Sequence, residues 1–148
     1  MDNNYGLYLA LKSDRFMMSV IGRMVEKSSG HIINIGSLAG REVYEMGNIY
    51  CASKHAVNAI SKGMRIDLNK HNIKVSEINP GLVETEFSKV RFKGDPKASK
   101  VYDGYKALEA KDIAEIIEFV INRPKHVNIA DVLILPQDQA TSSIINKK

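Results

Sequence analysis

The chain has 148 residues, of which 44% are hydrophobic and 26% charged, and this is enough for one globular domain with a modest core. No apolar run approaches the length of a membrane-spanning helix, so we expect no membrane role. The net charge of +4 comes from basic residues scattered along the chain, without the basic and aromatic stripe that is typical of nucleic-acid binding.

The first part of the chain predicts a helix, a strand and a second helix. Apolar positions predict a helix from Tyr5 to about Glu26, and the β-branched run 31–35 is typical of a strand buried on both faces. Residues 40–47 predict a loop. Asn48 is expected to cap a helix over about 48–70. The apolar residues expected on one side of this helix are Ala52, Ala56, Val57, Ile60, Met64 and Leu68.

The second part predicts two further strands around a third helix. A strand is expected over 73–78, closed by Pro80-Gly81, and residues 87–105 predict a mobile segment with a short helix. A clear helix runs from Asp112 to about Asn122, and a last strand covers 127–135. Alternating helices and strands predict an α/β fold with a parallel sheet. In such sheets ligands bind at the carboxyl ends of the strands.

Tyr50 and Lys54 combine into a possible acid/base pair. They lie four residues apart, so both side chains share one face near the start of the second helix. A phenol has a pKa of about 10, and a neighbouring ammonium group and a helix N-terminus both favour the phenolate. Such a tyrosine can protonate a carbonyl oxygen as hydride reaches the carbon. Ser37, at the end of the preceding strand, can hydrogen-bond the same oxygen.

The Tyr-x-x-x-Lys spacing alone is weak evidence, because the chain contains it at Tyr8/Lys12, Tyr50/Lys54 and Tyr102/Lys106. Only Tyr50 follows a strand that ends in a serine, with the small residues 51–53 after it. Simpler interpretations also exist for each part. Tyr50 and Lys54 can be a surface pair, Ser37 a strand-end hydroxyl, and Pro80-Gly81 a plain turn.

Three motifs in order carry a resemblance to a known family. They are Ile33-Asn34-Ile35-Gly36-Ser37, Tyr50-Cys51-Ala52-Ser53-Lys54, and Asn79-Pro80-Gly81 with Thr85. From about Val25 to Leu135 the chain resembles the short-chain dehydrogenase/reductases. Residues 80–87 and 90–95 look especially like the branch of NADP-dependent 3-hydroxy acid and serine dehydrogenases, which also reduces short semialdehydes such as malonic semialdehyde.

The resemblance implies a role for each matching residue. Ser37 would orient the substrate carbonyl, Tyr50 would be the acid/base, and Lys54 would also bind the nicotinamide ribose. The residues expected to border the nicotinamide are Pro80, Gly81, Val83 and Thr85. The cofactor would be NADP, with NAD left open, and the substrate a small hydroxy acid or carbonyl compound. The first two helices resemble those of the family's subunit interface, which implies a homo-oligomer.

The resemblance also implies that the chain is partial. It looks like the C-terminal part of a Rossmann-like, doubly wound sheet, so we expect 1–148 to be a single partial domain with three parallel strands. The family's Gly-rich pyrophosphate turn has no counterpart, and its active-site asparagine is left open between Asn3 and Asn4. Strand 31–36 would become an exposed edge. Two alternatives follow: an inactive remnant that associates with a full-length relative, and an unrelated α/β binding module.

Other side chains give weaker signals. The four histidines and Cys51 lack metal-ligand spacing, so we expect no metal site. Arg91 can pair with a substrate carboxylate or be simply solvated. The single cysteine and the absence of a basic start followed by an apolar run predict a cytoplasmic protein.

Overall fold

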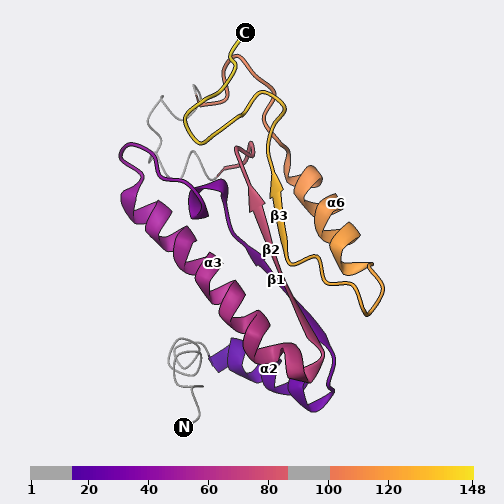
Figure 1. The fold of residues 1–148 in the computed structure, drawn as a ribbon. Coiled ribbons are helices and arrows are strands. Elements are labelled where there is room, and N and C mark those ends of the chain that lie inside the picture. The colour runs from indigo at the N-terminus through magenta and orange to yellow at the C-terminus, as the bar shows by residue number, and fades with distance from the viewer. Residues whose placement is uncertain (1–14, 87–100) are drawn as a thin grey trace.

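The computed structural model describes residues 15–86 and 101–148. Its centre is a parallel sheet with the order β1-β2-β3. The strands are β1 (Gly30–Ile35), β2 (Ile73–Pro80) and β3 (Asp131–Ile134). Figure 1 shows this sheet between two helical layers, and the strands end together near the C-terminus of the chain. The α/β class with three parallel strands, as predicted, is therefore confirmed.

The helices lie on both sides of this sheet. α2 (Arg15–Glu26) and α3 (Asn48–Leu68) share one face, and α6 (Ala110–Ile121) lies on the other (Figure 1). The short 3-10 helices are η1 (Leu38–Gly40) and η2 (Asn69–His71). None of the helices in the described ranges has the length and apolarity that crossing a membrane requires. The first ten residues of the predicted first helix lie outside the described residues.

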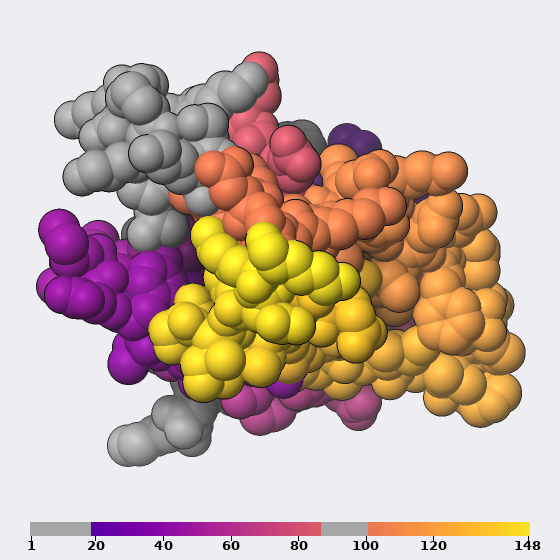
Figure 2. Space-filling view, turned by 90° about the horizontal axis from the view of Figure 1, so that it is seen from above, coloured from indigo at the N-terminus to yellow at the C-terminus, as the bar shows by residue number. Residues whose placement is uncertain are grey.

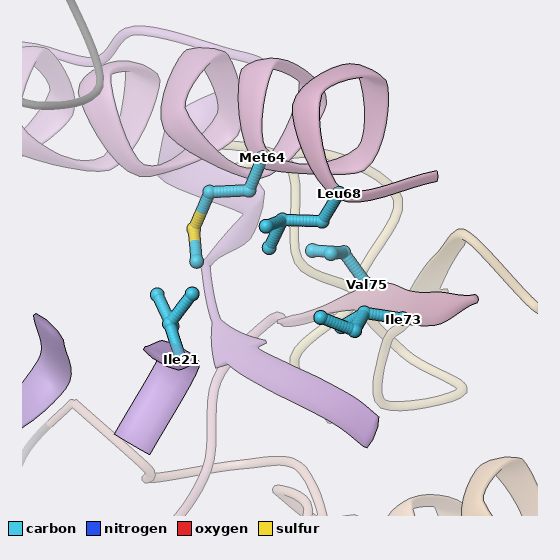
Figure 3. Packing of buried hydrophobic residues seen from close by; sticks show 5 residues of the cluster. All are labelled: Ile21, Met64, Leu68, Ile73 and Val75. Atoms are coloured by element: carbon cyan, nitrogen blue, oxygen red, sulfur yellow. The ribbon is translucent and has the colours of Figure 1, made fainter. Parts of the chain in front are cut away.

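The apolar core lies between α2, α3 and the amino-terminal half of β2. Figure 3 shows Ile21 of α2 facing Met64 and Leu68 of α3 and Ile73 and Val75 of β2. Val75 is fully buried and Met64 is 1% exposed. The core therefore fixes α3 against the sheet at the end remote from the strand C-termini, which leaves the other end of α3 free to carry polar chemistry.

β2 is buried at every residue except Lys74, and the prediction that β1 is buried on both faces was wrong. Every residue of β1 is partly exposed, and Ile35 is 47% exposed. Within the described ranges β1 pairs only with β2, from Gly30 with Ile73 to Ile35 with Ile78. β1 is therefore an edge strand in the described part of the chain, which agrees with the expectation that strand 31–36 becomes an exposed edge.

β2 runs two residues further than predicted and includes Pro80. Residues 77, 79 and 81 face β3: the Gly81 N–H donates to the Ile134 carbonyl over 2.8 Å. Pro80 therefore faces β1, whose last ladder bond comes from Gly36 to the Ile78 carbonyl. Because β1 has already turned away, the missing N–H of proline costs no hydrogen bond. Pro80 is the last residue of β2 and Gly81 forms a bend directly after it, so Pro80-Gly81 closes the strand, as predicted.

α3 does not have the single apolar side that was predicted. Met64 and Leu68 are buried, whereas Ala52, Ala56 and Ile60 are exposed. The reason is geometrical: residues four apart are rotated by about 40° around a helix with 3.6 residues per turn. Positions four apart along the helix therefore rotate gradually, from solvent at Ala52 to the core at Met64 and Leu68.

Several helix and strand ends also differ from the predictions. Gly47, not Asn48, is the N-cap of α3: its carbonyl accepts from Cys51 N at 2.7 Å, and a side chain there would overlap the Tyr44 ring. α3 ends at Leu68, and η2 covers the last residues of the predicted helix. α6 begins at Ala110 because the Asp112 carboxylate accepts from the Glu109 N–H at 2.7 Å, in a capping box.

β3 is shorter than the predicted strand 127–135. The Asn128 side chain bonds the Val75 carbonyl and the Ser76 hydroxyl, each at 3.5 Å, where backbone pairing would otherwise begin. Pairing therefore starts at Asp131, opposite Glu77. Of the segment predicted to be mobile with a short helix, 87–100 lies outside the described residues, and 101–105 forms turns and a bend.

Candidate active site

Ser37 stands where β1 ends and the chain turns into η1. Its hydroxyl accepts from the Ala39 N–H at 3.1 Å, and its own N–H donates to Asn79 Oδ1 at 3.0 Å. A side chain at Gly36 would overlap Asn79 Oδ1, so only glycine lets β1 pass this amide. The Gly-Ser sequence therefore places a hydroxyl at the carboxyl end of β1 and holds its backbone against β2.

Tyr50 and Lys54 project from the first two turns of α3, as their spacing predicted. The Lys54 ammonium donates to the Ile35 carbonyl at 3.0 Å and lies 5.9 Å from the centre of the Tyr50 ring. Burial lowers the pKa of Lys54, and the Glu77 carboxylate partly offsets this. The lysine is thus fixed between the end of β1 and the Tyr50 ring.

A cleft of about 380 Å³ opens at the carboxyl ends of the strands. Ligand clefts of this kind typically measure about 300–1,000 Å³. Its lining includes the seven residues to which the resemblance assigned a role in catalysis or cofactor binding. These residues are Ser37, Tyr50, Lys54, Pro80, Gly81, Val83 and Thr85. The fold therefore brings together side chains that are up to 48 positions apart in the sequence.

A polar network forms the floor below this cleft. Asn79 donates to Asp131 Oδ1 at 2.9 Å, and Arg41 pairs with the same carboxylate. Glu77 is 2% exposed and accepts from Asn58 Nδ2 at 2.9 Å, but its other oxygen has no partner among the described residues. Burial raises the pKa of Glu77, and the nearby Asp131 carboxylate raises it further. Polar side chains thus replace the apolar core as β2 approaches the site.

Four further polar or aromatic residues line the cleft that the sequence had not indicated: Tyr44, Tyr102, Gln139 and Ser142. The Tyr102 hydroxyl donates to the Val83 carbonyl at 2.8 Å, so this tyrosine supports the rim from a turn and not from a helix. Gln139 and Ser142 follow β3, and the rule that ligands bind at strand carboxyl ends applies to that strand too. Their position directly after the last predicted strand could therefore have indicated these two residues from the sequence.

Some sequence candidates cannot be placed. Tyr8, Arg91 and the two asparagines Asn3 and Asn4 lie outside the described residues. In the described ranges no three His, Cys, Asp or Glu side chains gather as metal ligands would. The expectation that no metal takes part stays a prediction.

A family model for short chain dehydrogenase matches residues 15–96. The chain belongs to the short-chain dehydrogenase family. This match covers the helix before β1, the Ser37 turn, the Tyr50/Lys54 helix and the Pro80-Gly81 strand end. The unrelated binding module considered from the sequence is therefore excluded.

Relatives within this dehydrogenase family have named activities. The NADP-dependent 3-hydroxy acid dehydrogenase YdfG of Salmonella typhimurium is 44% identical over 144 residues, covering 96% of this chain and 56% of the relative. The NADP-dependent 3-hydroxy acid dehydrogenase of Schizosaccharomyces pombe is 41% identical over 131 residues, covering 88% of this chain and 51% of the relative. The chain thus spans about half the length of the curated relatives it matches.

Solved structures of the family show the same arrangement. The closed form of a serine dehydrogenase complexed with NADP+ superposes with a TM-score of 0.82 at 42% identity, over 89% of this chain and 54% of that one. The serine dehydrogenase from Escherichia coli gives a TM-score of 0.67 at 36% identity, over 83% and 47%. The three strands and their helices therefore match Rossmann-type dehydrogenase structures, as the sequence implied.

Proposed function

We propose that this dehydrogenase transfers a hydride between NADP(H) and the alcohol or carbonyl group of a small hydroxy acid or semialdehyde. The supporting observation is that Ser37, Tyr50 and Lys54 line one cleft together with the Pro80–Thr85 rim. The 3-hydroxy acid dehydrogenases named above are NADP-dependent relatives in which the same class of substrate reacts.

Each of the three residues has a distinct task in this mechanism. In the direction of reduction, the Ser37 and Tyr50 hydroxyls would hold the substrate oxygen, and Tyr50 would donate the proton to it. Lys54, held at the Ile35 carbonyl, would keep positive charge beside the phenolate that remains. In the direction of oxidation, Tyr50 would take the proton back. NADPH or NADP+, when bound, supplies or accepts the hydride.

The residues present fit the nicotinamide end of that cofactor. The Lys54 ammonium and the Thr85 hydroxyl give the cleft groups that can bond ribose hydroxyls and a carboxamide, and 380 Å³ accommodates a nicotinamide beside a small acid. The chain contains no Gly-x-Gly-x-x-Gly sequence, the usual cradle for the pyrophosphate. We therefore propose that Tyr50, Lys54, Pro80, Gly81, Val83 and Thr85 contact the nicotinamide side only.

Contacts to the nicotinamide side alone predict weak cofactor affinity for the 148-residue chain. Without a pyrophosphate cradle, isothermal titration with NADPH should show dissociation constants well above the micromolar range, because the phosphate contacts supply much of the binding free energy. Nicotinamide mononucleotide, which lacks the adenylate half, should bind nearly as well as NADPH. Micromolar binding of NADPH, with NADPH clearly preferred over the mononucleotide, would contradict the proposal that the chain contacts the nicotinamide side only.

Turnover can be tested directly with the substrates this branch implies. Purified chain is incubated with NADPH and malonic semialdehyde, or with NADP+ and serine or 3-hydroxypropionate, and the absorbance of NADPH is followed. We expect slow, cofactor-dependent turnover of the three-carbon substrates. If NADPH absorbance does not change with any short hydroxy acid or semialdehyde, hydride transfer by this polypeptide is rejected.

The alternative function is association, and the outer face of α3 favours it. Ala52 and Ala56 are exposed there, and Ile60 is 42% and Ile66 76% exposed. Small and branched apolar residues on a helix face suit packing against another helix. We propose that α2 and α3 form a homo-oligomer, or pair with the same helices of a full-length relative.

Association predicts a change in mass that one substitution reverses. The chain should elute from a sizing column as a dimer or larger, and Ala56→Arg should shift it to the monomer because a charge would be buried at the contact. Lys62→Glu, on the same helix, should leave the mass unchanged. A parent chain that is monomeric, and that does not co-elute with coexpressed full-length YdfG, contradicts the association proposal.

A further inference from the structure

The turn that follows β3 reaches back to the end of β2 through one side chain. Gln139 is 5% exposed, and its Oε1 accepts from the Leu82 N–H at 2.9 Å. Its Nε2 donates to the Thr141 carbonyl at 3.1 Å. Because an N–H must meet an oxygen and a carbonyl must meet an N–H, the orientation of this amide is fixed by its partners.

Gly81 is glycine because of this contact. Its φ is not among the positive values, so the chain does not need glycine for its backbone conformation here. A Cβ at Gly81 would instead overlap Gln139 Oε1 and come within 2.8 Å of Leu135 Cδ2. The Pro-Gly sequence at the end of β2 therefore makes space for the Gln139 side chain.

Residues 138–146, which we call the rim segment, form a compact loop that touches both lips of the cleft. The Asn146 N–H donates to the Asp138 carbonyl at 2.8 Å and closes the loop on itself. Gln139 connects it to the lip at Leu82, and the Ser142 N–H donates to Glu42 Oε2 at 2.7 Å on the lip that follows Ser37. Seen from above, the yellow C-terminal residues lie across the carboxyl end of the fold (Figure 2).

We propose that Gln139 is a positioning residue, whose side-chain amide ties the rim segment to Gly81-Leu82 and thereby sets the wall formed by residues 80–85. That this wall faces a nicotinamide rests on the proposed function. The tie itself rests only on the contacts described. The Leu82 carbonyl is already held by the Leu108 N–H at 3.0 Å, and Gln139 supplies the partner of the Leu82 N–H.

Two substitutions separate the two hydrogen bonds of Gln139. Gln139→Glu keeps an acceptor for Leu82 but loses the donor to Thr141, and Gln139→Met keeps the volume but loses both. Amide hydrogen exchange of the 15N-labelled chain reports the result. We expect Leu82 exchange to rise about tenfold in Gln139→Met and to stay near the parent value in Gln139→Glu. Ser142 exchange should rise in Gln139→Met, because the rim segment is released from Leu82, and should stay near the parent value in Gln139→Glu, which keeps the tie.

A spectroscopic signature distinguishes positioning from a general structural effect. In Gln139→Glu the Leu82 amide resonance should shift with pH as the introduced carboxyl group ionises, whereas the parent resonance should not. Gln137→Met, at an exposed neighbouring residue, is the matched control and should change neither amide. In the turnover assay, Gln139→Met should lose kcat/KM and Gln139→Glu should retain most of it.

The exchange data decide the proposal without activity. Unchanged Leu82 protection in Gln139→Met overturns it. If that variant does not fold, a pH-independent Leu82 resonance in Gln139→Glu overturns it instead. Absent turnover with intact exchange effects would reject the proposed function and leave the Gln139 tie standing.

Discussion

Tyr50→Phe is expected to lower the turnover number by about 10²- to 10⁴-fold, the usual contribution of a positioned acid/base group. The substitution removes only the hydroxyl that would pass a proton to the substrate oxygen. The neighbouring Lys54 keeps its bond to the Ile35 carbonyl, so the cleft should retain its shape. NADPH consumption with malonic semialdehyde, measured as kcat and KM separately, shows the effect as a loss of kcat.

Tyr105→Phe is the matched control for this substitution. It makes the same chemical change at a tyrosine that does not line the cleft and whose buried hydroxyl has no partner among the described residues. Burial raises the pKa of Tyr105 to about 12, so its hydroxyl stays protonated throughout the assay range. Turnover should be unchanged in this variant. Equal rates in the parent and Tyr50→Phe would reject catalysis at Tyr50, whatever the source of the remaining activity.

The sequence could predict which residues gather in the cleft because most of them lie at the ends of strands. Ser37 and Pro80-Gly81 each close a strand, and Tyr50 opens the helix between them. A parallel sheet brings strand ends to one rim whatever the details of packing. The same rule, applied to the strand at 131–134, would have indicated Gln139, whose role depends on the space left at Gly81.

The polar floor could not be predicted from the pattern. In β2, Ile73, Val75 and Glu77 share one face of the strand, so a single carboxylate follows two core residues. In a sequence, a charged residue in a strand usually indicates an edge or a solvent-facing position. Its burial depends on Asn58 of α3, which lies nineteen residues away and donates to it. Only the packing of α3 on the sheet shows that Glu77 is a buried acid.

Glu77→Gln is expected to stabilise the fold at neutral pH by about 1–3 kcal/mol, the cost of a buried polar group without a full set of partners. Burial raises the pKa of Glu77 above its ordinary value of 4.5, so the folded state favours the neutral form. Below 4.5 the acid is protonated in both states, and the parent has no penalty. As the pH rises towards the folded-state pKa, the unfolded chain ionises first, so the parent loses stability until that pKa is passed.

The glutamine side chain cannot ionise, and it keeps an oxygen that accepts from Asn58 Nδ2. Urea unfolding at a series of pH values should therefore give a difference in the free energy of unfolding between variant and parent that is small below pH 4.5 and grows as the pH rises.

The controls separate this effect from other titrating groups. Burial also lowers the pKa of His31, which removes stability as the pH falls below 6.5, but this contribution is common to both proteins and cancels. Glu115→Gln, at an exposed ion pair with Lys111, should show no pH-dependent difference. A Glu77→Gln difference that is constant with pH would show that the buried carboxylate is already ionised without cost, held by the opposing charges of Lys54 and Arg41.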